Sequence, residues 1–397
     1  MLANVSICKI FSCEYGIGFF YKAFIFLNSS LFYVFFRLII KKVKKILKKY
    51  GEKMRILAYI AIGFLLILGG CDIAKYYHQE YIPSITVDNK DGPASFYRPF
   101  TKSDKLSRLN QESTLKFTMD DKLPIVDGAT ALFPIYCSFV EAVYPSECSV
   151  NDCVKFSTTT GAYDNLIKGD VDIIFVAGPS KKQLEKATEA GLEFNLHPLG
   201  YEAFVFIVND KNKVDSLTVQ QIKDIYNGRI TNWKEVGGKN QSIKVYQRAA
   251  NSGSQTAFLK FMGKDADLIT PETHEVMSMM DGIVTVVEDY RNHKNSIGFS
   301  FRYYIETMQK DTKVKMIKLN GIAPTAENIR NRTYPVTDNF YAVTIKGRES
   351  ENTKKFLDWM VSEQGQKIIE KVGYVSLNEV KKEENKKAIK EKTEDAK

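Results

Sequence analysis

The apolar run at residues 171–177 (VDIIFVA) constrains the fold more than any other feature of this chain. All but one of its side chains are apolar, which is typical of a strand buried on both faces in a parallel sheet. Other strands are expected at 123–126, 154–157 and 203–209, and helices at 131–143, 163–168, 181–190 and 218–226. Strands that alternate with helices predict an α/β fold with helices on both faces of the sheet. Ligands of such sheets bind beyond the carboxyl ends of the strands.

Length and charge narrow the class of protein. A chain of 397 residues, 44% of them apolar, can bury a large core, and two lobes are expected. The net charge of +9 comes from one end: residues 1–53 carry ten basic and two acidic side chains, and Arg55 adds one more positive charge. From Cys71 onward the chain is formally neutral. A nucleic-acid partner, which needs a basic face, is therefore not expected.

A secretory signal is expected at residues 54–70. A basic start at Arg55 is followed by a mostly aliphatic stretch at 56–68, which is short for a membrane span, and by two glycines before Cys71. This ending resembles that of bacterial lipoprotein signals, which implies that Cys71 is lipidated and anchors the mature protein to the membrane. The alternative is an uncleaved anchor with an incidental cysteine.

Two interpretations of residues 1–53 stay open. Either translation starts at Met54, or 16–40 and 56–68 form a two-span hairpin whose seven lysines at 41–53 face the cytoplasm. Both interpretations place the chain after Cys71 on the extracytoplasmic face of the cell membrane. Two polar segments complete this part of the prediction, namely a tether at 71–120 and a charged tail at 380–397.

Residues 246–261 (YQRAANSGSQTAFLKF) contain the strongest pattern for an anion site. An amphipathic pattern follows a polar turn at 251–254, so a helix is expected to begin there. Its free N–H groups and positive dipole end suit an anion, Gly253 permits close approach, and Arg248 offers a planar fork of donors. The alternative is that a serine of the turn only caps the helix, while Arg248 forms a surface ion pair.

The same segment resembles the anion-binding loop of the phosphate-binding proteins that supply ABC transporters. Four more segments resemble that family in the same order, namely 126–134 (VDGATALFP), 156–163 (FSTTTGAY), 217–238 (LTVQQIKDIYNGRITNWKEVGG) and 356–377 (FLDWMVSEQGQKIIEKVGYVSL). The resemblance implies a type II periplasmic-binding-protein fold, in which a hinge joins two lobes and the ligand cleft lies between them. Lobe 1 would comprise about 121–200 and 300–379, and lobe 2 about 201–299. The resemblance also implies ABC permease subunits as partners and no cofactor.

The family's ligand contacts carry over to a set of residues in three loops. They are Thr130, the backbone of Ala131, Thr159, Arg248, Ser252, Gly253 and Ser254. At 159 and 254 a threonine and a serine replace the usual serine and threonine, and both keep a hydroxyl. Two acidic residues of the family are missing, because Ala177 and Ala250 stand at their positions.

The loss at Ala177 bears on selectivity. A carboxylate in a closed anion site accepts a hydrogen bond from a protonated oxyanion and repels one without a proton. Without it, we expect phosphate to be bound less selectively, or another anion to be preferred. Glu202 and Asp127 are the acidic residues that would replace it, although Glu202 equally suits a salt bridge at the hinge and Asp127 a turn.

No pattern for catalysis or for a metal site stands out. The 4 histidines lack ligand spacing, and there is neither a G-x-x-x-x-G-K-S/T loop nor a G-x-S-x-G turn. Cys148 and Cys153 form a disulfide in one interpretation, and in the other these two and Cys137 are all reduced. We therefore predict a non-enzymatic, lipid-anchored protein that captures phosphate or a similar tetrahedral oxyanion for an ABC importer. The alternative is a lipoprotein of the same fold with a degenerate cleft, which acts as a sensor or interaction module.

Overall fold

The computed structural model describes residues 97–380 and 383–384, except for 102, 104, 264–267, 269–275, 278–279, 289–294 and 310–311. The expected signal peptide, the lipidated Cys71 and residues 1–53 lie outside the described residues, as does most of the charged tail. Among the helices of the described part, none combines the length and the apolar character that crossing a bilayer requires.

Lobe 1 is built around two short parallel strands. Its elements are β1 (Val126–Gly128), the 3-10 helix η2 (Thr130–Leu132), α3 (Phe133–Val143), α4 (Val150–Cys153), α5 (Thr158–Lys168), β2 (Ile173–Val176), α6 (Lys181–Glu189), α12 (Glu351–Val361), α13 (Glu363–Val372) and β12 (Val375–Ser376). Every residue of β2 is buried, which confirms the buried strand that the apolar run predicts. However, β2 pairs in parallel with β1 and antiparallel with β11 (Thr337–Ile345), so the sheet is mixed.

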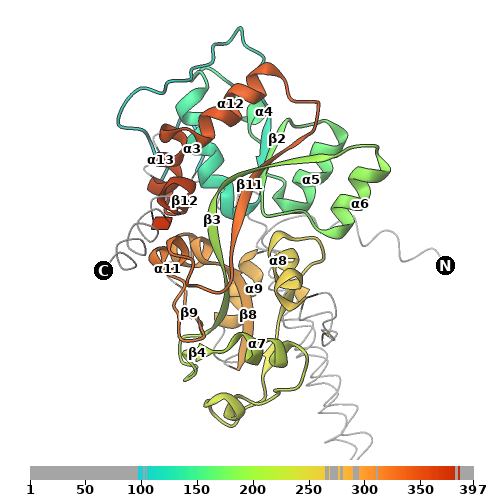
Figure 1. The fold of residues 1–397 in the computed structure, drawn as a ribbon, viewed down its shortest axis with the longest axis vertical. Coiled ribbons are helices and arrows are strands. Elements are labelled where there is room, and N and C mark those ends of the chain that lie inside the picture. Colours follow the sequence, from blue (N-terminus) through green and yellow to red (C-terminus); the bar gives the residue numbers. More distant parts are fainter. Residues whose placement is uncertain are drawn as a thin grey trace, which may run out of the picture. The chain divides into compact units, whose positions relative to one another are not determined.

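Two long strands, β3 (Phe194–Asn209) and β11, run side by side between the lobes (Figure 1). β3 is much longer than the strand expected at 203–209, because its first half pairs with β11. Its second half pairs antiparallel with β8 (Ser296–Phe301) and β9 (Val314–Met316), which belong to lobe 2. These strands join the lobes, and the predicted α/β, two-lobe, hinge-linked fold is confirmed.

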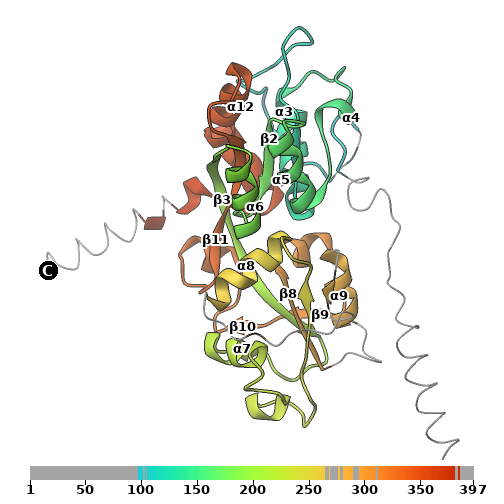
Figure 2. The same cartoon turned by 90° about the vertical axis from the view of Figure 1, so that its right-hand side faces the viewer.

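Lobe 2 has a hydrophobic core of its own, in which the Phe258 and Phe299 rings stack with centroids 4.5 Å apart. The elements of lobe 2 are β4 (Ser216–Leu217), α7 (Val219–Tyr226), η3 (Trp233–Val236), β5 (Lys244–Val245), β6 (Gln247–Arg248), α8 (Gly253–Met262), β7 (Val276–Met277), α9 (Met280–Glu288), β8, the π-helix η5 (Tyr304–Met308), β9, β10 (Lys318–Leu319) and α11 (Ala326–Arg330). Figures 1 and 2 show α7, α8 and α9 at one end of β3, and α3, α5 and α12 at the other.

The return to lobe 1 expected at about residue 300 needs correction. Ile317, Ile329 and Tyr334 are buried in the core of lobe 2, and β9 pairs with β3 there. Tyr303 packs in the core of lobe 1, but the chain from β9 to Tyr334 belongs to lobe 2. The sequence of this segment shows no clear helical or strand periodicity. Its lobe could not be predicted locally, because β9 pairs with residues about a hundred positions earlier in the chain.

Local signals set several helix ends as expected. Ser180 and Thr218 begin α6 and α7 with capping boxes, in which the side chain at the third helical position bonds back to the cap. The strand expected at 154–157 does not form, and Val154 makes only an isolated bridge. The reason is that the Ser157 N–H donates to the Asp127 side chain at 2.8 Å, which turns the chain into α5.

The end of the segment expected as a tether packs on lobe 1. Tyr97, Leu106 and Phe117 are buried in its core. The Phe117 N–H donates to the Val143 carbonyl at the end of α3 at 2.9 Å. From Tyr97 onward, the described part of this segment therefore belongs to the folded domain.

The structure distinguishes the two interpretations of the cysteines. Cys148 and Cys153 form a disulfide around the short helix α4. Cys137 is a buried free thiol on α3.

Candidate anion-binding site

The turn at 251–254 leads from β6 into α8. Ser252 is the N-cap residue, and its Oγ accepts a hydrogen bond from the Gln255 N–H at 3.3 Å. Asn251 has a φ of 66°, a left-handed conformation that asparagine adopts more readily than most residues. The predicted helix start is confirmed, and Ser252 does cap the helix. Ser254 lies in the first turn and is free of that capping role.

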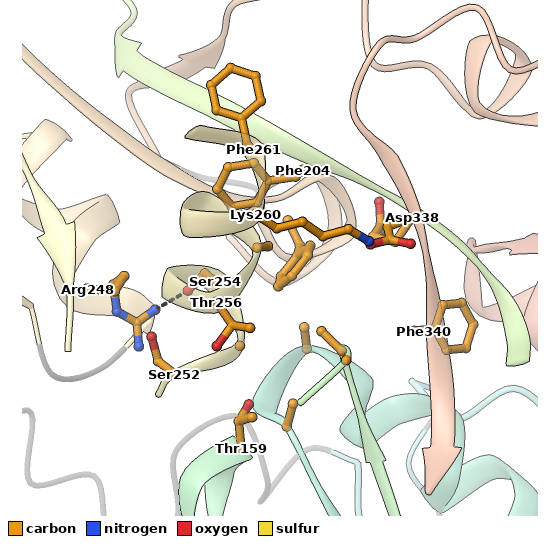
Figure 3. Close-up of a pocket in the computed structure, with 18 of the residues that line it drawn as sticks. Thr159, Phe204, Arg248, Ser252, Ser254, Thr256, Lys260, Phe261, Asp338 and Phe340 are labelled. Atoms are coloured by element: carbon orange, nitrogen blue, oxygen red, sulfur yellow. Dashed lines mark hydrogen bonds and ion pairs between the residues drawn. The ribbon is translucent and has the colours of Figure 1, made fainter. Parts of the chain in front are cut away.

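Arg248 is buried, with 7% of its surface exposed, so the alternative of a surface ion pair is wrong. Its Nε donates to the Met277 carbonyl at 3.0 Å, and its Nη1 donates to the Ser254 Oγ at 3.2 Å. Its backbone N–H donates to the Gln255 Oε1 at 2.9 Å. These contacts hold the guanidinium beside the N-terminus of α8 (Figure 3). The cation and the positive end of the helix dipole therefore act on the same point.

Lobe 1 contributes the opposite side of the site. Thr130 and Ala131 form η2 directly after β1, and Thr159 lies in the first turn of α5. Thr159 faces α8 closely: a Cβ atom placed on Gly253 would lie 3.1 Å from the Thr159 Oγ1 and 3.8 Å from the Ala177 Cβ. All the predicted contact residues line one cavity between the lobes, as do the two alanines that replace the family's acidic residues. The structure brings these residues together, and their role as ligand contacts stays a prediction.

The lobes touch at the edge of this cavity next to the turn. The Ser180 Oγ donates to the Asn251 Oδ1 at 3.0 Å. Gln183 Nε2 and Thr160 Oγ1 donate to the Asn251 carbonyl at 3.2 and 3.3 Å. Three hydrogen bonds from lobe 1 therefore hold one residue of lobe 2. The sequence did not predict these contacts. Ser180 and Gln183 form the capping box of α6, so their presence is already explained by the start of that helix.

Asp127 does not replace the missing aspartate. Its Oδ1 accepts from the Gly128 and Ser157 N–H groups, both at 2.8 Å, and its Oδ2 accepts from the Asn165 side chain at 2.9 Å. Asp127 is fully buried and does not line the cavity. Of the two roles considered for Asp127, a replacement acceptor or a turn residue, the structure supports the turn residue, which holds the loop before α5.

Glu202 lines the cavity from β3, at the hinge. Its Oε1 accepts from the Ala203 N–H at 2.7 Å and from the Arg302 Nε at 3.4 Å. Arg302 also contacts Glu306 at 2.5 Å and the Gly373 carbonyl at 2.6 Å. Burial raises the pKa of Glu202 from 4.5 to about 7, and Arg302 opposes this rise. Glu202 is therefore an ion-pair partner at the hinge.

One further contact of the cavity carries no signal in the sequence. Lys260, on α8, forms an ion pair with Asp338, on β11, across the cavity (Figure 3). The two residues are 78 positions apart, and only the tertiary structure brings them together.

A family model described as a PBP superfamily domain matches residues 125–364, more than half of the chain. The chain belongs to the PBP superfamily. Among curated relatives, the phosphate-binding protein PstS of Borreliella burgdorferi is 26% identical over 265 residues, which cover 65% of this chain and 91% of the relative. Protein SphX of Synechococcus elongatus is 26% identical over 274 residues, which cover 64% of this chain and 77% of the relative.

A solved structure is also similar to this PBP-superfamily chain. It comes from Clostridium perfringens, holds bound phosphate, and is described as a phosphate ABC transporter substrate-binding protein. The similarity covers 64% of this chain and 99% of that chain, with 27% sequence identity and a TM-score of 0.51.

Proposed function

We propose that this protein captures phosphate, or a similar tetrahedral oxyanion, between its lobes. The observation that carries the proposal is the buried Arg248 guanidinium beside Ser254, at a helix N-terminus that faces Thr159 across the cleft. Backbone N–H groups, hydroxyls and a buried cation converge there, and an anion with several acceptor oxygens satisfies them together. The names of the phosphate-binding relatives support the same ligand.

The proposed role is in transport and not in catalysis. A binding protein of this kind would close its lobes on the anion and release it to ABC permease subunits, with the hinge at β3 and β11 absorbing the movement. A lipid anchor on Cys71 would hold the protein on the extracytoplasmic face of the cell membrane. The relatives named as phosphate-binding and transport proteins support this role.

Titration calorimetry on the full-length protein tests the proposed site. Arg248→Ala is expected to weaken phosphate binding by roughly 2–5 kcal/mol, the usual cost of deleting a buried, hydrogen-bonded charge. Ser252→Ala is expected to cost less, about 1–3 kcal/mol, because one neutral donor is lost and the backbone donors of the turn remain.

Arg229→Ala is the matched control, because the Arg229 side chain is 68% exposed and pairs with Asp224 on α7, away from the cavity lining. Its affinity should equal that of the unchanged protein. If the unchanged protein and Arg248→Ala bind every oxyanion tested equally, the site is wrong, and the degenerate-cleft sensor or interaction module becomes the better description.

A further inference from the structure

The cavity is far larger than a tetrahedral oxyanion. Its volume is about 720 Å³. On the same measure a water-sized group needs about 15 Å³, so four oxygens fill only about 60 Å³. The hydrogen bonds from Ser180, Gln183 and Thr160 to Asn251 already close the edge next to the anion site. The extra volume therefore does not come from lobes that stand apart at that edge.

The remaining cavity wall is rich in aromatic side chains. We call five aromatic residues of this wall the aromatic compartment, namely Phe204, Phe261, Phe301, Phe340 and Tyr341. Glu202, Tyr374 and the Lys260–Asp338 ion pair line the same cavity. Phe204 packs edge-on against Phe301, with ring centroids 5.9 Å apart at an interplanar angle of 73°. In Figure 3, Arg248 and Ser254 lie at one end of the lining, and Asp338 and Phe340 lie at the other. An organic group attached to a bound phosphate would thus lie against these rings, beside the Lys260–Asp338 ion pair.

The alanines at 177 and 250 suit an ester oxygen. The acidic residues expected there would accept the proton of a P–OH group, and they would repel an oxygen that has none. A phosphomonoester carries carbon in place of that proton on its bridging oxygen. Ala177 and Ala250 line the cavity with methyl groups instead, and a methyl group neither requires nor repels that oxygen.

We propose that the preferred ligand class is a phosphomonoester with an apolar or aromatic organic group. Its phosphate would lie at Arg248 and the N-terminus of α8, and its organic group would lie in the aromatic compartment. The proposal rests on the proposed function, because the same residues hold the phosphate group.

Calorimetry on the full-length protein with inorganic phosphate, methyl phosphate and phenyl phosphate tests the ligand class. Phenyl phosphate is expected to bind more tightly than inorganic phosphate, and at least about tenfold more tightly than methyl phosphate, a difference of about 1.4 kcal/mol. Tighter binding of inorganic phosphate than of phenyl phosphate would overturn the preference for an ester. If inorganic phosphate binds while phenyl phosphate binds no better than methyl phosphate, the aromatic compartment is not a subsite, and the proposed function stands. If none of the three binds, both proposals fail.

Filling the cavity gives a second test. Ala257 lines it from α8, one helical turn from Ser254 and one from Phe261, so a larger side chain there would occupy the path to the rings. Ala257→Phe is expected to weaken phenyl phosphate at least about tenfold and to leave inorganic phosphate within about threefold. Leu259→Phe is the control, because Leu259 lies on the same helix, is 48% exposed and does not line the cavity.

Equal losses of both ligands in Ala257→Phe, with an unchanged melting temperature, would overturn the assignment of a separate compartment. If that variant fails to fold, the comparison of methyl and phenyl phosphate on the unchanged protein still decides the question.

Discussion

Replacing Ala177 with aspartate is expected to make the site reject sulfate. Ala177 lies close to the N-terminus of α8, with its Cβ 3.8 Å from the position of a Cβ on Gly253, so a carboxylate there would face the anion. At about 4 Å, two unit charges repel by about 4 kcal/mol at the effective permittivity near a protein surface. Sulfate has no proton to offset this repulsion, so its affinity should fall about a thousandfold. Protonated phosphate donates a hydrogen bond to the carboxylate, so its affinity should change much less.

Competition calorimetry with phosphate and sulfate on the full-length protein measures this effect. The unchanged protein is expected to bind phosphate only slightly more tightly than sulfate, because residue 177 presents a methyl group and not a carboxylate. Ala177→Asn is the control, since it has the shape of aspartate without the charge. The reasoning is refuted if Ala177→Asn penalises sulfate as strongly as Ala177→Asp. It is also refuted if the unchanged protein already rejects sulfate by several orders of magnitude, and Glu202, which lines the cavity, would then be the first residue to replace.

Glu202→Gln should remove a pH dependence of stability. Burial raises the pKa of Glu202 from 4.5 to about 7, so the folded state binds the proton more tightly than the unfolded state. The free energy of unfolding is therefore highest below pH 4.5 and falls by about 3 kcal/mol as the pH rises from there through 7. Urea unfolding across this range should show the decline in the unchanged protein and not in the variant. Gly253→Val should lower phosphate affinity at least about tenfold in calorimetry, because even a Cβ there would lie 3.1 Å from the Thr159 hydroxyl. Adding Thr159→Ala should recover part of that loss, and no recovery would mean that the two residues do not meet. Cys71→Ser should move the protein from the membrane fraction to the soluble fraction, and a variant that stays with membranes contradicts the lipid anchor.

Short-range signals determined the elements that carry the anion site. Ser252 caps α8 because a hydroxyl at that position reaches the N–H three residues later. The apolar run predicted β2, because a strand buried on both faces needs no alternation. The resemblance then predicted which loops meet, and all its residues line one cavity. These predictions depend on neighbours a few residues apart, or on the order of segments along the chain.

Only the tertiary structure decided how the lobes are joined and what else the cavity can hold. β3 is long because β11, more than a hundred residues later, pairs with its first half, and β9 stays in lobe 2 because it pairs with the second half. Glu202 and Asp127 look alike as acidic residues in the sequence. In the structure, Glu202 lines the cavity beside Arg302, whereas Asp127 accepts hydrogen bonds from two backbone N–H groups and the Asn165 side chain. The aromatic compartment likewise gathers rings from Phe204 to Tyr341. Contacts between residues so distant in the chain leave no periodic pattern of apolar residues in the sequence. Such a pattern reports only which face of its own helix or strand a residue occupies, whereas packing of the whole fold determines which distant residue it meets.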